Sequence, residues 1–149
     1  MKRLKKSSVF IGSNVIVRYF AGDLEAKKLL GPVIDGGVKG FINEIVFSEV
    51  IFLTIRLVTC RGAHELKRKP ELVKEALKNI KDKVSFINTY FNEVEVDEAV
   101  KEYALKVMED HGRLPNDALI AATCRHHGLE VIATFDEDFK RIPWLKTIP

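Results

Sequence analysis

Short apolar runs alternate with helix-like segments along nearly the whole chain of 149 residues. Five of these runs have the length and composition of strands, at residues 8–11, 38–42, 92–96, 129–134 and 144–148. Parallel neighbours in a sheet need crossover connections, which are usually helical and right-handed. The order therefore predicts one α/β domain, residues 1–149, with three layers. Its centre is a mostly parallel sheet of roughly five strands, and helices cover both faces.

Several polar residues stand where helices are expected to begin. Asp23, Asn43 and Asp97 are predicted N-caps, and Asn43 starts a long helix whose apolar face comprises Ile45, Val46, Val50, Leu53 and Leu57. Pro70 is expected as the first residue of another helix.

The last long helix is expected to run from Asn116 to His127. Pro115 should end the preceding segment, Asn116 should be the N-cap, and Gly128 should form the C-cap. Asp117 then lies in the first turn, where a negative charge interacts favourably with the helix dipole. Taken alone, Asp117 is explained by that interaction.

Composition limits the setting of the protein. The formal charge of +3 permits a polyanionic partner but does not require one. Residues 1–6 resemble the basic start of a signal peptide, but no sufficient apolar segment follows, and no apolar run reaches membrane-spanning length. We therefore expect a soluble cytoplasmic protein that makes no contact with a membrane. Cys60 and Cys124 lie in apolar runs and are expected to be buried, reduced thiols.

Residues 61–83 are the most basic part of the chain. Two interpretations of these charges remain open, a solvated helix face and a rim that contacts phosphates. The basic residues are Arg61, Lys67, Arg68, Lys69, Lys74, Lys78, Lys81 and Lys83. The apolar side of residues 71–91, which ends in Phe86, Ile87, Tyr90 and Phe91, could likewise form an interface or part of the core.

Acidic and polar residues recur at the ends of apolar elements. Gly12-Ser13-Asn14 follows the first strand, and Asp136 with Asp138 follows a later one. Functional crevices of parallel sheets lie beyond the carboxyl ends of the strands, so both turns should face one crevice. Glu49 and Asp117 occupy comparable positions on helices. Clustered carboxylates repel one another unless a cation neutralises them, and oxygen ligands select hard cations such as Mg²⁺ or Mn²⁺. Two such ions can promote phosphodiester hydrolysis.

Four segments carry a resemblance to a known family. They are Ser13-Asn14-Val15-Ile16, Ser48-Glu49-Val50, residues 116–122 (NDALIAA) and residues 134–139 (TFDEDF). In this order and spacing, the chain from Val9 to about Ile148 resembles PIN-domain proteins, and among them the VapC-type toxins of toxin–antitoxin pairs.

The resemblance implies a function and a set of site residues. It implies a Mg²⁺-dependent endoribonuclease (Mn²⁺ being the alternative cation) that hydrolyses RNA with metal-activated water. Glu49, Asp117 and Asp136 are then the catalytic, metal-binding acids, and Asp138 is an additional metal ligand. Ser13, Asn14 and Thr134 have supporting roles. The implied partners are RNA, a cognate antitoxin and a second copy of the chain.

Gly12 departs from the family pattern, which has an acid at this position. Losing a hard anionic ligand should weaken cation binding and catalysis. The glycine is either native, giving an inactive module that binds RNA or an antitoxin, or an acquired inactivating change. A PIN nuclease that processes ribosomal RNA is a further alternative. If the site is catalytic, Gly12→Asp should restore Mg²⁺-dependent ribonuclease activity.

Overall fold

The computed structural model of the protein describes residues 7–149, so the basic segment 1–6 lies outside the described residues. Its centre is a five-stranded sheet in the order β3-β2-β1-β4-β5, and every neighbouring pair is parallel. The strands are β1 (Ser7–Ile11), β2 (Val38–Ile42), β3 (Phe91–Glu93), β4 (Val131–Ala133) and β5 (Lys146–Ile148). The predicted parallel α/β sheet is confirmed.

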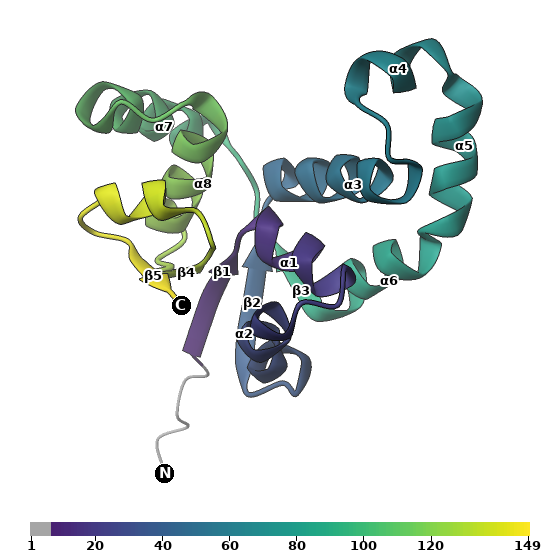
Figure 1. Ribbon diagram of the computed structural model, residues 1–149. Coiled ribbons are helices and arrows are strands. Elements are labelled where there is room, and N and C mark those ends of the chain that lie inside the picture. Colours follow the sequence, from purple (N-terminus) through teal and green to yellow (C-terminus); the bar gives the residue numbers. More distant parts are fainter. Residues whose placement is uncertain (1–6) are drawn as a thin grey trace.

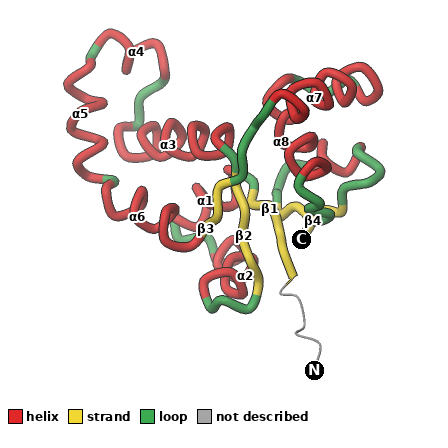
Figure 2. The backbone as a smooth tube through the Cα atoms, turned by 180° about the vertical axis from the view of Figure 1, so that it is seen from behind, coloured by secondary structure: helices red, strands yellow, loops and turns green. Residues whose placement is uncertain are grey.

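Helices connect all of these strands. Within residues 7–149 they are α1 (Ser13–Phe20), α2 (Leu24–Ile34), α3 (Glu44–Thr59), α4 (Ala63–Arg68), α5 (Pro70–Asn79), α6 (Lys81–Tyr90), α7 (Glu98–His111), α8 (Pro115–His126) and the 3₁₀-helix η1 (Glu137–Arg141). α7 and α8 pack together beside β4 and β5, whereas α1, α2 and α3 lie on the β2 side (Figures 1 and 2). The sheet is therefore flanked by helices, as predicted.

Three of the five strands are shorter than predicted. β3, β4 and β5 have three residues each, although the apolar pattern suggested five or six. Backbone pairing nevertheless extends past two of them: the Val94 N–H donates to the Ile42 carbonyl and the Thr134 N–H donates to the Ile148 carbonyl, both at 2.9 Å. Residues that flank a strand can be apolar because they are buried beside the sheet, without pairing in it. The apolar pattern therefore overestimates the length of the strands.

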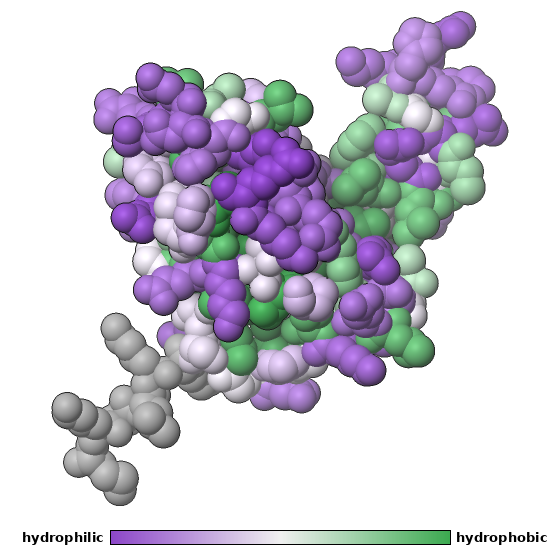
Figure 3. Space-filling view, turned by 60° about the vertical axis from the view of Figure 1, so that its left-hand side comes forward, coloured by the Kyte–Doolittle hydropathy of each residue, from purple (hydrophilic) through white to green (hydrophobic). Residues whose placement is uncertain are grey.

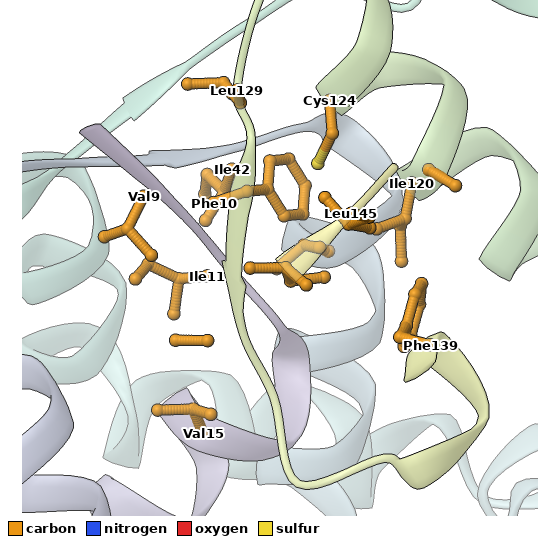
Figure 4. Close-up of a cluster of buried hydrophobic side chains, with 14 of the residues drawn as sticks. Val9, Phe10, Ile11, Val15, Ile42, Ile120, Cys124, Leu129, Phe139 and Leu145 are labelled. Carbon is orange, nitrogen blue, oxygen red and sulfur yellow. The ribbon is translucent and has the colours of Figure 1, made fainter. Parts of the chain in front are cut away.

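One large core joins the sheet to its helices. Figure 4 shows side chains of β1, α8 and the C-terminal segment meeting between the layers, among them Phe10, Ile120 and Phe139. The small residues Ala118, Ala121 and Ala122 of α8 are fully buried, which lets this helix approach the sheet closely. Elements anchored in this core carry the candidate site.

Residues 61–83, which we call the basic arm, stand away from the sheet (Figure 1). A separate small core stabilises the arm against the end of α3, and it consists of Ile55, Leu66, Ala76 and Ile80. The predicted apolar face of α3 is consequently wrong in its second half: Ile55 is buried, whereas Leu57 is 45% exposed. The C-terminal half of α3 extends past the sheet, so only the side that meets the arm is covered.

The predicted helix starts are largely confirmed. The side chains of Asp23, Asn43 and Asp97 each accept a hydrogen bond at 3.0 Å from a backbone N–H three residues ahead, and Pro70 is the first residue of α5.

The start of α8 differs from the prediction. Leu114 is the N-cap and Pro115 the first helical residue, so Asn116 is not a cap. Proline has no N–H to leave unpaired in a first turn, so Pro115 begins this helix rather than ending the preceding one. At the other end His127 is the C-cap, and Gly128 follows it with a φ of +69°.

Two further predictions are decided by burial. Cys124 is buried, but Cys60 is exposed because it ends α3 beside the arm, in the left-handed conformation. Ile87 and Phe91 belong to the core, and the ring of Phe86 stacks on that of Tyr19 with centroids 5.1 Å apart. This apolar side is therefore mostly core. Between residues 7 and 149, no helix is both long enough and apolar enough to cross a membrane.

Candidate active site

The residues singled out from the sequence gather at the edge where the parallel strands end. Gly12, Ser13 and Asn14 connect β1 to α1, and Thr134 follows β4. α8 precedes β4 and therefore begins at the same edge, which places Asp117 there in its first turn. Glu49 lies in the second turn of α3. Asp136 caps η1, and Asp138 is within it.

A hydrogen-bond network shapes the loop that carries Asp136. The Thr134 hydroxyl accepts from the Asp136 N–H at 3.0 Å and is 3.5 Å from the Asn14 amide nitrogen. The Asn14 side-chain oxygen accepts from the Phe135 N–H at 3.2 Å, and the Asp136 carboxylate accepts from the Asp138 N–H at 2.9 Å. Asn14 and Thr134 thus hold the loop in a fixed conformation. Ser13 begins α1 without a comparable contact among the hydrogen bonds of the described residues.

Arg18, one turn beyond Asn14 on α1, contacts the same loop. Its guanidinium carbon lies 3.9 Å from the centroid of the Phe135 ring, a cation–π geometry. The sequence contains no pattern that singles out this contact, because the two residues are more than 100 positions apart.

Asn43 links the two helices that carry Glu49 and Asp117. It is fully buried, and its side chain caps α3 while its amide nitrogen donates to the Thr123 hydroxyl of α8 at 2.9 Å. The cap was predicted, but the link was not. Because Asn43 binds both helices, it fixes the position of Glu49 relative to Asp117.

Two of the acids lie in an environment that disfavours their charged forms. Burial, and then the neighbouring charge of Asp117, raise the pKa of Glu49. Burial and the charge of Asp136 raise the pKa of Asp117, Arg113 opposes this increase, and Asp138 adds to it. Asp117 therefore interacts with each of the other three acids: its charge raises the pKa of Glu49, and the charges of Asp136 and Asp138 raise its own. The structure brings Glu49, Asp117, Asp136 and Asp138 into one electrostatic cluster.

The donor atoms of this cluster match a hard divalent cation in kind. They are carboxylate oxygens, and one of them, Oε1 of Glu49, is buried with no hydrogen-bond partner within residues 7–149. Such an atom is costly unless a positive partner satisfies it. In that same range, however, no three His, Cys, Asp or Glu side chains are arranged so that they could hold one ion. The carboxylates match such a cation chemically, but no three of them within residues 7–149 converge on one position.

Gly12 has a backbone conformation that any residue can adopt, with φ −72° and ψ 151°. A Cβ atom there would lie 3.1 Å from the Ala133 carbonyl oxygen and 3.3 Å from the Thr134 hydroxyl, so β1 and β4 would separate slightly to accept it. A side chain at position 12 would thus start beside Thr134, in the loop that leads to Asp136. The backbone does not require glycine, and an acid there would extend the cluster.

Arg113 is a site residue that the sequence pattern did not reveal. It lies in the loop between α7 and α8, its side chain is only 13% exposed, and its Nη1 is 3.8 Å from an Asp138 oxygen. A single arginine in a loop produces no periodic pattern, so its proximity to the acids emerges only from the fold. A surface cavity of about 650 Å³ lies elsewhere, near the starts of β1 and β4, and none of the four acids lines it.

Fold and site together define a class: a parallel α/β protein with an acidic cluster at the carboxyl ends of its strands. The sequence profile of the PIN domain matches residues 9–145. The chain is 35% identical to ribonuclease VapC2 of Methanocaldococcus jannaschii, over 99% of both chains, and 32% identical to ribonuclease VapC6 of the same organism, over 97% of this chain and 99% of the relative. The chain therefore belongs to the PIN-domain family, in its VapC group.

Solved structures share the fold at lower identity. A toxin–antitoxin complex from Klebsiella pneumoniae aligns with a TM-score of 0.66 and 20% identity, covering 95% of this chain and 96% of the other. VapC20 of Mycobacterium tuberculosis, a toxin that cleaves the sarcin–ricin loop, aligns with a TM-score of 0.61 and 19% identity, covering 95% and 99%. At these identities the similarity establishes the three-layer fold alone.

Proposed function

We propose that the protein is a metal-dependent endoribonuclease, the toxin of a toxin–antitoxin pair, whose catalysis is weakened by Gly12. The observation that carries this proposal is the electrostatic cluster of Glu49, Asp117 and Asp136 in a chain 35% identical to a ribonuclease over its full length. Asp117, Glu49 and Asp136 would hold Mg²⁺ or Mn²⁺, with Asp138 as an additional ligand. When bound, the cation supplies an activated water for phosphodiester hydrolysis.

The residues of the chain have distinct roles in this proposal. Asn14 and Thr134 hold the loop that carries Asp136. Asn43 links α3 to α8 and so fixes the distance between Glu49 and Asp117. Burial, and then the charges of neighbouring acids, raise the pKa of both Glu49 and Asp117, so a bound cation would stabilise their charged forms. The protein's contribution is therefore the fixed placement of anionic oxygens.

The basic arm supports RNA as the substrate class. It carries eight Lys and Arg against four Asp and Glu, an excess greater than the formal charge of +3 of the whole chain. The arm and the α7–α8 pair rise on either side of α3 (Figure 1), and the surface is notched between hydrophilic projections (Figure 3). Lys74 and Lys78, both exposed, present adjacent positive charges on α5. We propose that the arm binds the phosphates of an RNA strand. The bond to be cleaved would then lie beside the acids.

An antitoxin and a homodimer are the proposed protein partners. Structures of similar fold include a toxin–antitoxin complex and VapBC2 of Rickettsia felis bound to promoter DNA, at 18% identity and a TM-score of 0.63, covering 95% of this chain and 97% of the other. α3 offers exposed apolar side chains, because Phe52, Leu57 and Val58 are each at least 39% exposed. Light scattering of the purified chain, alone and with the product of the adjacent gene, tests both partners.

Restoring the missing acid tests the catalytic proposal. Gly12→Asp should cleave RNA about a hundredfold faster than the present chain with Mg²⁺ or Mn²⁺ and stop in EDTA, since losing even supporting residues of metal sites costs about 10- to 100-fold. Gly12→Asn is the matched control, because it imposes the same Cβ contacts without the charge. If Gly12→Asp binds Mn²⁺ and RNA no better than Gly12→Asn, the catalytic proposal is wrong.

An inactive module that binds RNA or an antitoxin is the second candidate, and Gly12 is the observation that favours it. The two candidates predict different results for the unaltered chain. A weakened nuclease cleaves slowly and in proportion to added Mn²⁺, whereas a binding module retains RNA without any cation-dependent product.

A further inference from the structure

A nearly buried arginine lies among the acids of the candidate site. Arg113 exposes 13% of its side chain, and its Nε donates to the His111 carbonyl at 3.2 Å. Its Nη1 lies 3.8 Å from Oδ2 of Asp138, whose own side chain is 53% exposed. Buried guanidinium groups are usually paired at closer range. Arg113 is therefore held by the His111 carbonyl and lies within ion-pair distance of Asp138, without a close charge-assisted hydrogen bond to it.

From this geometry we propose that Arg113 is the resident counter-ion of the acidic site and competes with a divalent cation for Asp138. The inference rests on the proposed metal-dependent function. The positive charge of Arg113 partly neutralises the cluster while no cation is bound. A cation entering the cluster is repelled by that charge and must draw Asp138 away from it.

The inference explains a disagreement within the site. The carboxylates match a hard cation in kind, yet within residues 7–149 no three are arranged around a single position. Gly12 removes one anion from this edge, while Arg113 keeps Asp138 directed toward itself. Both residues shift the balance toward the cation-free arrangement.

Mn²⁺ binding, measured by calorimetry, tests the competition. Arg113→Gln removes the charge but retains a side-chain donor, and it should bind Mn²⁺ on the order of tenfold more tightly than the unaltered chain, because a nearby like charge no longer repels the ion. Arg113→Lys preserves the charge and should bind within about twofold of the unaltered chain. Arg125→Gln, about 12 Å along α8 from Asp117 by helical rise, removes the same charge at a distance and should change little.

Thermal melting in EDTA provides a readout that does not need the cation. Without it, Arg113→Gln should melt several degrees below Arg113→Lys, and saturating Mn²⁺ should raise its melting temperature by more than it raises that of Arg113→Lys. If Arg113→Gln binds Mn²⁺ no more tightly than Arg113→Lys, the competition is refuted. Equal melting of the two variants in EDTA refutes the counter-ion role.

If the proposed metal-dependent function is wrong, the Mn²⁺-binding results will differ from those expected when only the inference on Arg113 is wrong. If neither the unaltered chain nor Gly12→Asp binds Mn²⁺, both the metal-dependent function and the competition are wrong. The comparison of Arg113→Gln with Arg113→Lys in EDTA still decides the counter-ion role. If Gly12→Asp binds Mn²⁺ but Arg113→Gln gives no gain in either background, the function survives and only the inference on Arg113 fails.

Discussion

The acidic site and the basic arm are stabilised in different ways. The elements that carry the acids are anchored in a core of 27 buried residues, whereas the arm is stabilised by a cluster of four. The two regions also differ in charge, because the net positive charge of residues 61–83 exceeds that of the whole chain. Large cores fix side chains closely, and small ones open at lower cost. Under the proposed function, the body would therefore hold the acids in place, and the arm would provide adaptable contact with RNA.

The largest expected effect separates chemistry from binding. In the Gly12→Asp background, Asp117→Asn should slow RNA cleavage about a hundredfold or more, because it removes the acid that interacts with all the others. RNA affinity should remain nearly unchanged, since the arm is intact. Cleavage and fluorescence anisotropy measured in parallel check both expectations. Asp110→Asn, an exposed acid paired with Lys106 on α7, is the control. Equal loss in both variants would contradict a special role for Asp117.

The second prediction tests whether the arm is an independent unit. Ile80→Ala removes a fully buried side chain from the arm's core and should cost about 2–4 kcal/mol there. Hydrogen exchange should then quicken within residues 61–83 while β1 and β4 stay protected. Ile132→Ala, in the main core, should instead lower the global melting temperature. If both variants unfold in one identical transition, the arm and the body form a single cooperative unit and the comparison fails.

Local signals in the sequence predicted much of the body. The caps Asp23, Asn43 and Asp97, together with the alternation of strands and helices, are determined by neighbouring residues and are confirmed. The parallel order of the strands places Gly12, Asp117 and Asp136 at one edge, so the region of the site follows from topology.

Contacts between residues far apart in the chain could not be predicted from the sequence. The bond from Asn43 to Thr123 spans 80 positions, and Arg113 reaches Asp138 across α8 and β4. The exposure of Leu57 and Cys60 depends on where α3 leaves the sheet, which no local pattern specifies. Asn116 shows that two plausible local signals can compete, since the adjacent Pro115 starts the helix instead. The roles of Glu49, Asp117, Asp136 and Asp138 as ligands remain predictions.

The third prediction concerns the arm's charges. Lys74→Glu together with Lys78→Glu should weaken RNA binding about tenfold at low salt and reduce the slope of log affinity against log salt by about two, one per lysine. The paired change Lys27→Glu and Lys28→Glu, on exposed residues of α2, alters the net charge equally away from the arm. Anisotropy titrations at several salt concentrations compare the two. Equal losses would mean that RNA responds to net charge and not to the arm.

The smallest expected effect tests whether the negative charge of Glu49 lowers the stability of the folded state. A carboxyl whose pKa is raised in the folded state destabilises that state at pH values above the raised pKa, and the cost disappears as the pH falls below its ordinary pKa. Glu49→Gln should therefore raise the melting temperature at pH 7 in EDTA by about 3 °C, the shift expected for about 1 kcal/mol at this chain length. Near pH 3.5 the gain should vanish, because Glu49 is then protonated in both states. Glu44→Gln, at the exposed start of the same helix, should produce no such gain. A Glu49→Gln variant that is less stable at pH 7 would show that the carboxylate is satisfied as it stands, and the body would then carry its site without an electrostatic cost.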